Sequence, residues 1–500
     1  MDHTVKKTTR PPYGLLAVLM VGAFITFLNN TLLNVALPSI MTDLHVNTAT
    51  VQWLSTVFML VSGIMIPTTA FLIQKYSVRH LFLAAMGLFT IGTIIGGIAH
   101  IFPLLLAARV VQAAGAAIMM PVLMNVMLVS FPIEKRGTAM GVFGLIIMFA
   151  PAIGPTLSGW IVEHYSWRML FMFIAPISLL IFLIGFFLLK DKKEKVDIRL
   201  DLLSVVLSSL GFGGLLYGFS SAGNAGWGSP QVYLSLMIGV ITLTLFILRQ
   251  SKLEEPMLSF AVFKFPSFTL ASIIIMILNM ALFSGFLMLP IYAQAIRGIS
   301  PMDTGLMLLP GAVLNAFLSP ITGRLFDKYG GRVLAVIGLT ITTVATYFFS
   351  QLTFETSYTS LIVLHALRML GMALIFMPVS TNGLNELPTR FYPHGTAMNN
   401  TLNQVSGAIG TALLVTIMTI RTESASVRLL TEAAGQQTAG VQQHIAMQAM
   451  LEGINFAFLV ATFITAGALV LSFFMKRATQ AEDKSGRPSA TESRAKLAEN

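Results

Sequence analysis

The sequence predicts an all-α polytopic membrane protein, because its composition is strongly apolar, its apolar residues form long segments and its basic residues are unevenly placed. The chain has 500 residues, 55% of them hydrophobic and 10% charged, with a mean hydropathy of +0.79. Soluble globular chains carry about 25% charged residues, and disordered chains are poorer in apolar side chains. The chain has no cysteine, which excludes disulfide scaffolds and thiolate metal sites.

Fourteen apolar segments are each long enough to cross a bilayer, which takes about 20 mostly apolar residues. In chain order the expected spans are 13–38, 51–73, 81–99, 103–129, 138–162, 169–189, 201–220, 231–249, 268–293, 302–323, 332–351, 358–382, 395–419 and 452–475. A polar, basic start without a cleavage site indicates that the first span is retained and is not a signal peptide. Twelve spans remain an alternative, because Gly211, Gly213 and Gly214 make the seventh and eighth segments the least secure.

The basic residues orient these spans. With a cytoplasmic N-terminus, 25 of the 31 Lys and Arg fall in inner segments, four in outer loops and two inside spans. This distribution fits the positive-inside rule, so both termini are expected in the cytoplasm. The net charge of +10 then needs no nucleic-acid partner.

An internal repeat divides the chain into two halves. Residues 67–79 and 320–332 share six of thirteen residues, and Gly137-Thr-Ala-Met140 recurs as Gly395-Thr-Ala-Met398. The copies have the same orientation, which predicts two parallel six-helix halves. The expected organisation is a cytoplasmic N-terminus (1–12), a first half (13–189), a linker with two inserted helices (190–266), a second half (267–475) with an external, partly helical loop (420–451), and a disordered cytoplasmic tail (476–500).

Four motifs resemble the fourteen-helix drug:proton antiporter branch (EmrB/QacA type) of the major facilitator superfamily. They are Leu28-Asn-Asn-Thr-Leu-Leu-Asn-Val-Ala-Leu-Pro38, Gly323-Arg-Leu-Phe-Asp-Lys-Tyr-Gly-Gly-Arg332, Arg109-Val-Val-Gln112 followed by Gly115, and Pro151-Ala-Ile-Gly-Pro-Thr-Leu-Ser-Gly159. The resemblance covers about nine-tenths of the chain and is nearest to the multidrug and lincomycin exporters of Gram-positive bacteria. It implies the major facilitator fold.

The resemblance also implies a central cavity. Its expected residues are Asn29, Asn30, Asn34, Arg109, Gln112 and Arg368. Asn30 and Asn34 share a helical face, and bonding to a neighbouring helix is an equally good interpretation of them. Arg109 and Arg368 are the only basic residues deep in the predicted spans, where an ionisable side chain indicates a functional site. The alternative is that each Arg anchors a helix end through backbone carbonyls. Asn29 stands where the branch usually has an Asp, and Asn cannot take up a proton.

The middle thirds of the predicted spans hold no carboxylate, so the expected proton-coupling residue lies elsewhere. The candidates are His365, Glu163, Asp303 and Glu386. His365 and Arg368 are three residues apart and share a helical face. A histidine that only anchors the outer interface is an equally good interpretation of His365.

The two copies of the loop motif predict an inner gate. Its expected residues are Lys75, Arg79, Gly323, Asp327, Lys328 and Arg332. Asp327 can accept from amides at a helix start and pair with Arg332 or Arg324, with simple loop capping as the alternative. The first copy has Gln74 at the position of Asp327, so the gate is predicted to be asymmetric.

The antiporter-like motif of the fifth span contains Pro151, Gly154, Pro155 and Gly159. These residues lack donors or side chains, which allows a bend and the close approach of a neighbouring helix. Ordinary small-residue packing is the alternative. In the family that the motif resembles, this packing seals the halves against leak.

No enzyme signature, cofactor motif or metal site is apparent, because the eight histidines are scattered and no phosphate-binding glycine loop is present. The resemblance implies a proton-coupled multidrug efflux transporter that exports amphipathic drugs by alternating access. We expect a monomer in the bacterial plasma membrane, with drugs, protons and lipid as its partners. An exporter of an endogenous metabolite or lipid, and a non-transporting sensor on the same fold, are the alternatives.

Overall fold

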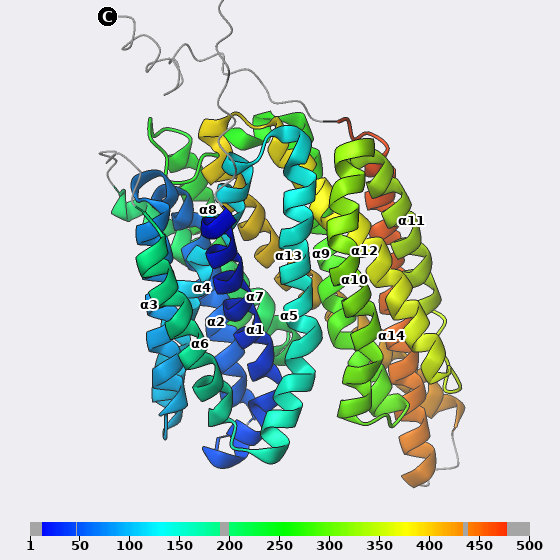
Figure 1. The fold of residues 1–500 in the computed structure, drawn as a ribbon. Coiled ribbons are helices and arrows are strands. Elements are labelled where there is room, and N and C mark those ends of the chain that lie inside the picture. The colour runs from blue at the N-terminus through cyan, green and yellow to red at the C-terminus, as the bar shows by residue number, and fades with distance from the viewer. Residues whose placement is uncertain (1–12, 47, 191–199, 434–438, 478–500) are drawn as a thin grey trace, which may run out of the picture.

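The computed structural model describes residues 13–46, 48–190, 200–433 and 439–477, and over these ranges its regular structure is helical. The long helices are α1 (Tyr13–Asp43), α2 (Thr48–Lys75), α3 (Val78–Gly97), α4 (Phe102–Ser130), α5 (Arg136–His164), α6 (Arg168–Leu188), α7 (Leu202–Ala225), α8 (Pro230–Gln250), α9 (Pro266–Ile291), α10 (Pro301–Tyr329), α11 (Gly331–Phe349), α12 (Tyr358–Glu386), α13 (Tyr392–Glu432) and α14 (Ala439–Ser472). Short helical turns are η1 (Ile133–Lys135), η2 (Phe260–Lys264), η3 (Tyr292–Ile296) and η4 (Thr389–Phe391). The predicted helical membrane fold is confirmed (Figure 1).

The helices begin and end where local chemistry favours a break. Ser77, Ser300 and Ser357 each accept a hydrogen bond from a backbone N–H in the first turn of the helix that follows. Gly330 adopts a φ of 80° between α10 and α11, a conformation that glycine adopts without steric cost. The chain can therefore reverse direction within one residue at this point.

The two inserted helices, α7 and α8, are each long enough to span a membrane. Thirteen helices of the described chain, α7 and α8 among them, contain an apolar stretch long enough to cross a membrane. α5, with 29 residues, has the length of a fourteenth span. At the other end of the chain, α13 and α14 extend through most of the segment predicted as a loop, and Arg428 pairs with Glu452 at 2.6 Å to join them.

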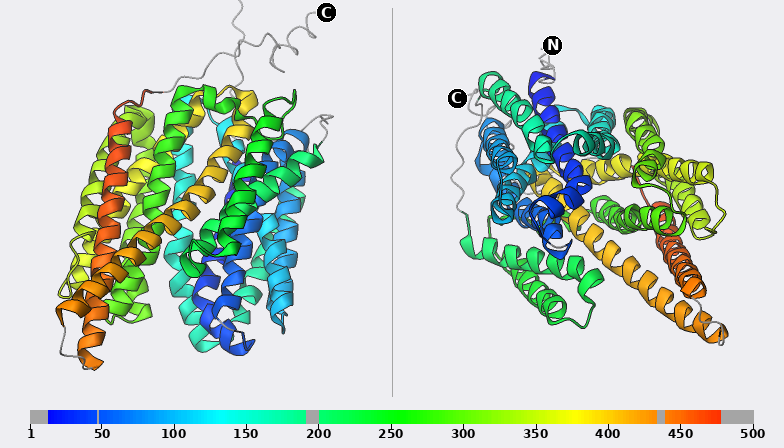
Figure 2. Two further views of the ribbon diagram at one scale, coloured as in Figure 1. Left: turned by 180° about the vertical axis from the view of Figure 1, so that it is seen from behind. Right: turned by 90° about the horizontal axis from the view of Figure 1, so that it is seen from below.

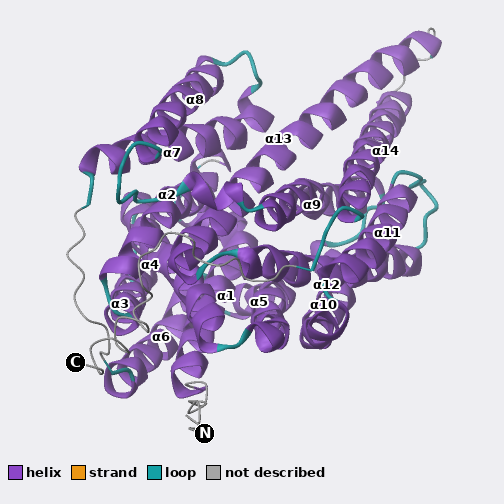
Figure 3. Ribbon diagram, turned by 90° about the horizontal axis from the view of Figure 1, so that it is seen from above, coloured by secondary structure: helices purple, strands orange, loops and turns teal. Residues whose placement is uncertain are grey.

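The two six-helix halves repeat the same helix contacts. In the first half α1 packs on α5, α2 on α4, and α3 on α4; in the second half α9 packs on α13, α10 on α12, and α11 on α12. The α7–α8 hairpin lies outside both halves, against α2 and α13 (Figure 3). Gly211, Gly214 and Gly239 let the two helices of the hairpin pack backbone to backbone.

The halves are joined tightly at only one end, which we call the terminal end because the start of α1 and the end of the described chain after α14 both lie there (Figure 1). The apolar core of the first half continues at this end into Leu384, Tyr392 and Met398 of the second half. Toward the opposite, distal end the ribbons of the two halves diverge (Figures 1 and 2).

Candidate functional site

A buried cation lies at the centre of the first half. The Arg109 side chain on α4 is 0% exposed. Its Nη2 donates to Asn30 Oδ1 at 3.0 Å, its Nη1 to Gln112 Oε1 at 3.1 Å and its Nε to the Leu54 carbonyl at 3.3 Å. The guanidinium also stacks over the ring of Phe58, 4.3 Å from its centroid. These contacts connect α1, α2 and α4 through one side chain.

Gln112 extends this network by donating to Thr93 on α3 at 2.8 Å. Asn29, which precedes Asn30 in the sequence, is also buried. Within the described part of the chain, its Nδ2 has no hydrogen-bond partner. The side chain of Asn34 lies outside the described residues. A buried donor without a partner is costly, so Asn29 marks a place where a polar atom of another molecule or conformation would be stabilised.

The second half carries a different pair at the equivalent place. α4 and α12 both have 29 residues and align without a gap at a shift of 256, which pairs Arg109 with His365 and Gln112 with Arg368. The same shift pairs Gly115 with Gly371, and each glycine meets the backbone of the preceding helix. Arg109 and Arg368, both predicted to lie deep in their spans, are thus about one turn apart along the aligned helices.

Arg368 is 2% exposed and donates from Nη2 to the Ala281 carbonyl on α9 at 2.6 Å. Its guanidinium occupies the space that a side chain at Gly285 would need, and His365 packs against Gly311 in the same way. In the described chain, Arg368 Nε and His365 Nδ1 have no hydrogen-bond partner. Both buried arginines therefore bind backbone carbonyls within their own half, and neither pairs with a described carboxylate.

The other proton-coupling candidates lie at separate places. Glu163 is exposed near the distal end of α5. Asp303 is exposed in the first turn of α10, where its carboxylate accepts from the Ser300 hydroxyl at 2.8 Å. Glu386 accepts from the Ser267 and Phe268 amides at 2.6 and 3.2 Å and so caps the start of α9.

The halves are latched together by Asp327 of α10. Its carboxylate accepts from the backbone amides of Gly137 and Thr138, each at 2.8 Å, and from the Thr138 hydroxyl at 2.6 Å. These groups form the first turn of α5, where a negative charge is stabilised by unpaired N–H groups and the helix dipole. The carboxylate was expected near the α11 start and its arginines, but it caps a helix of the opposite half.

Glycines allow α5 and α10 to approach closely enough for this contact. A methyl group at Gly323 would overlap the Gly137 carbonyl, and one at Gly141 would overlap the Ser319 carbonyl. The backbones of α5 and α10 therefore touch along the terminal end. Small residues spaced by four are a recognised pattern for close helix packing in membranes, so Gly137 and Gly141 carried a signal that the sequence interpretation did not use.

The remaining gate residues contact their own half. Arg79 donates to the Phe186 carbonyl of α6 at 3.2 Å. Lys75 and Lys328 lie beside the rings of neighbouring tyrosines, and Arg332 is exposed. The described contacts of these basic residues thus lie within their own halves, while Asp327 makes the contact across the halves.

The first-half copy of the loop motif contacts the start of α13. Gln74 Nε2 lies 3.3 Å from Nε2 of His394, a residue that the sequence interpretation did not single out. At the start of α5, Arg136 donates to Asn385 Oδ1 at 3.2 Å and lies over the Tyr392 ring. The two copies therefore differ in chemistry, with a carboxylate on one side and an amide and an imidazole on the other.

The proline and glycine motif of α5 serves contacts inside the first half. A side chain at Gly154 would overlap the Thr31 hydroxyl of α1, whereas Gly159 faces open space. The side chains of Pro151 and Pro155 lie outside the described residues. Contact with the second half is made nearer the terminal end, at Gly137 and Gly141.

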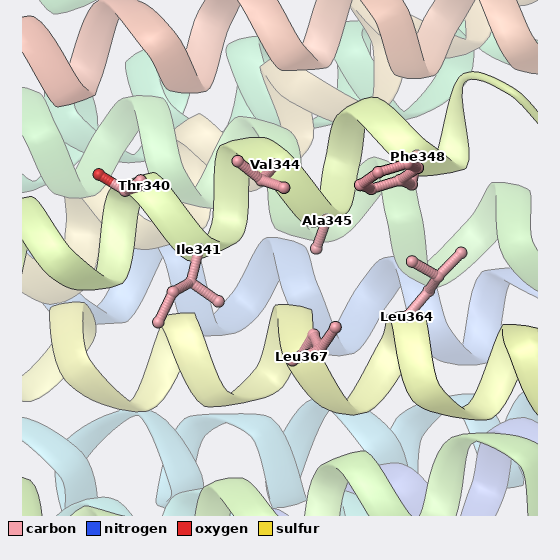
Figure 4. Close-up of a pocket in the computed structure, with 7 residues that line it drawn as sticks. All are labelled: Thr340, Ile341, Val344, Ala345, Phe348, Leu364 and Leu367. Carbon is pink, nitrogen blue, oxygen red and sulfur yellow. The ribbon is translucent and has the colours of Figure 1, made fainter.

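A pocket of about 380 Å³ lies away from these groups, between α11 and α12 (Figure 4). Its lining is almost entirely apolar and consists of Thr340, Ile341, Val344, Ala345, Phe348, Leu364 and Leu367. In a bilayer such a surface depression suits an acyl chain better than a polar ligand. It adds no polar group to the buried networks.

Two carboxylates at helix ends hold neighbouring helices together. Arg168 lies 2.7 Å from Asp43 and lowers the pKa of that carboxyl. Arg249 binds Asp201 through two hydrogen bonds, of 2.5 and 3.0 Å, and holds the pKa of Asp201 at about 2. The first pair joins α1 to α6, and the second joins the ends of the α7–α8 hairpin.

Comparison with known proteins shows what the chain is similar to. The Major Facilitator Superfamily model matches residues 19–411. The chain is 50% identical to the uncharacterized MFS-type transporter YcnB of Bacillus subtilis (93% of this chain, 95% of that protein). It is 42% identical to the lincomycin resistance protein LmrB of the same organism (92% and 95%) and 27% identical to the multidrug export protein EmrB of Haemophilus influenzae (92% and 94%).

A solved structure, that of the human organic anion transporter MFSD10, superposes with a TM-score of 0.63 over 91% of this chain and all of that one. The two sequences are 13% identical. The likeness shows the fold alone.

Proposed function

Because the chain belongs to the major facilitator superfamily of membrane transporters, we propose that it exports amphipathic drugs in exchange for protons by alternating access. The observation that carries the proposal is the latch between Asp327 and the start of α5, which closes the terminal end while the halves diverge at the other (Figure 1). A latch between two repeated halves is what a transporter needs in order to open one end at a time.

The proposed orientation places the terminal end in the cytoplasm. Lys135, Arg324, Lys328 and Arg332 are exposed at this end, and cytoplasmic loops are enriched in Lys and Arg. The structure then corresponds to the outward-facing state of a multi-pass protein of the bacterial plasma membrane.

The proposed cavity wall in the first half is the Arg109 network. Asn30 and Gln112 hold the guanidinium, and Asn29 offers a buried donor without a partner among the described residues. The surrounding apolar side chains suit amphipathic molecules, since binding of varied drugs relies on deformable apolar surface with few fixed polar contacts. Arg368 and His365 would supply the corresponding polar groups of the second half.

Transport is tested in inverted membrane vesicles that contain the full chain. Lincomycin is the first compound to test, because the lincomycin resistance protein is a close relative. We expect an imposed proton gradient to drive its uptake into the vesicles and added drug to accelerate proton efflux from them. Drug uptake that is unchanged when the gradient is collapsed would reject proton coupling, and no uptake of any drug in a broad panel would reject drug export.

A further inference from the structure

The segment between α8 and α9 is fastened across the terminal end. Met257, Leu258 and Val262 are buried in the apolar cluster that both halves share. The Leu258 amide donates to Gln250 Oε1 of α8 at 3.1 Å, and the Ser259 amide donates to His394 Nδ1 of α13 at 3.1 Å. We call residues 257–262 the strap, because they tie the inserted hairpin to the second half.

His394 joins the strap to the first half. It is 6% exposed, its Nδ1 accepts from Ser259, and its Nε2 lies 3.3 Å from the side-chain amide of Gln74. A neutral imidazole has one acceptor nitrogen and one N–H. Since Nδ1 is the acceptor, the proton is on Nε2, which lies beside the Gln74 side-chain amide, whose nitrogen donates to the Ala70 carbonyl at 3.0 Å. One ring therefore accepts from the strap on one side and contacts Gln74 of α2 on the other.

Protonation is incompatible with this arrangement. An imidazolium donates from both nitrogens, so a proton on Nδ1 would point at the Ser259 N–H, which is also a donor. The strap amide would lose its acceptor in a buried site, and a buried donor without a partner is costly. The closed terminal end thus requires the neutral ring.

We propose that His394 is a proton-binding site whose occupancy is linked to opening of the terminal end. Proton binding releases the strap, and closure of the strap expels the proton, because linkage between two binding events is reciprocal. The repeat supports this assignment: the shift that pairs Gly137 with Gly395 pairs Arg136 with His394. The first half has a permanently charged side chain at this position, and the second half has one that can gain and lose its charge.

Charged groups on the elements around the ring are mainly basic. They are Lys75 on α2, Lys252 and Lys264 in the α8–α9 segment, Arg390 in η4, and Arg136 at the start of α5, with Glu254 and Glu255 on the α8–α9 segment. The Glu386 carboxylate at the end of α12 already caps α9. The contacts of the ring itself are the Ser259 amide, the Gln74 amide and the Phe391 ring.

The test measures the terminal end directly. The chain has no cysteine, so a spin-labelled pair can be placed at Glu134→Cys in η1 and Thr389→Cys in η4, two exposed positions on opposite halves. Distances between the labels are recorded in nanodiscs between about pH 8 and pH 5.5, the range in which histidine titrates. We expect a longer-distance population that grows as the pH falls, by at most about tenfold per pH unit for one proton.

His394→Asn keeps an acceptor near the position of Nδ1 and cannot be protonated, so it should hold the short distance throughout the range. His394→Lys should favour the long distance even at high pH. His80→Asn, at an exposed histidine in the first turn of α3, is the control and should keep the pH response. A label distance that does not change with pH in the wild type would overturn the proposal. A pH response of that distance that persists in His394→Asn would overturn it as well.

This inference rests on proton coupling in the proposed function, but the two can fail separately. Drug-driven proton flux with no pH response of the label pair would reject the role of His394 alone. A pH response abolished by His394→Asn in a chain that transports no drug would reject drug export alone.

Discussion

The Asp327 carboxylate accepts a hydrogen bond of 2.8 Å from the backbone amide of Gly137, 190 residues earlier in the chain. The contact joins the end of α10 to the start of α5, across the boundary between the repeated halves. Because it involves a charge and a helix N-terminus, it is stronger than a neutral hydrogen bond. It can also be broken without unfolding either half, since most of the shared apolar cluster lies in the first half and the second half has two further clusters of its own.

Asp327→Asn should weaken the latch. The amide retains one acceptor oxygen but loses the charge, and a hydrogen bond to a charged group is worth about 1.5–3 kcal/mol. We expect the terminal end to open more often and drug export to fall several-fold at normal protein abundance. The measurement is the label distance between η1 and η4 together with vesicle uptake. Lys328→Gln, at the exposed neighbouring residue whose ammonium lies over the Tyr329 ring, is the control, and an equal loss there would argue against a specific latch.

Gly323→Ala should prevent closure altogether. The added methyl group overlaps the Gly137 carbonyl, and overpacking of this kind costs about 1–3 kcal/mol. We expect export to fall at least tenfold while the amount of protein in the membrane stays normal. Gly159→Ala is the matched control on α5, because a methyl group there meets no atom. Normal export by Gly323→Ala would show that the backbones of α5 and α10 do not need to touch.

The sequence predicted the fold well because hydropathy, loop charge and an internal repeat are all one-dimensional signals. The latch was predicted only in part. Asp327 was recognised, but its partner Gly137 lies on a helix far away in sequence, and which helices cross is decided by packing. The same limit applied to His394, whose partners Gln74 and Ser259 come from α2 and the strap. The alignment that pairs Gln112 with Arg368 could be made only from the observed ends of α4 and α12.

Asp201→Asn should loosen the inserted hairpin. Arg249 holds the pKa of Asp201 at about 2, below its usual 3.8. A lowered carboxyl pKa stabilises the folded state above the unfolded pKa, and this stabilisation is lost as the pH falls from about 4 to about 2. At neutral pH the free energy of unfolding of the variant should therefore be lower by about 1 kcal/mol after solvent screening. Its melting temperature should fall by a few degrees. Thermal unfolding in detergent checks this, and the difference from the wild type should shrink toward pH 3.

Arg109→Ala separates a transport role from an anchoring role. Removing the guanidinium leaves Asn30, Gln112 and the Leu54 carbonyl without their donor, at a cost of about 1–3 kcal/mol for each buried group left unpaired. If Arg109 serves the cavity, export should be lost while membrane abundance stays normal, although the melting temperature falls. Equal loss of export and abundance would show that the side chain chiefly anchors α4 to α1 and α2.

Arg109→Lys sharpens that comparison. A lysine keeps the charge, but its point-like ammonium cannot reproduce the planar fork that binds three partners at once. A cavity that needs only positive charge should regain export with Arg109→Lys, whereas a role that depends on the hydrogen-bond geometry should not. Arg368→Lys is the parallel variant in the second half, where the guanidinium has one carbonyl acceptor at Ala281. Because fewer contacts are lost there, it should retain more activity than Arg109→Lys, and the reverse order would contradict the assignment of the Arg109 network as the principal polar centre.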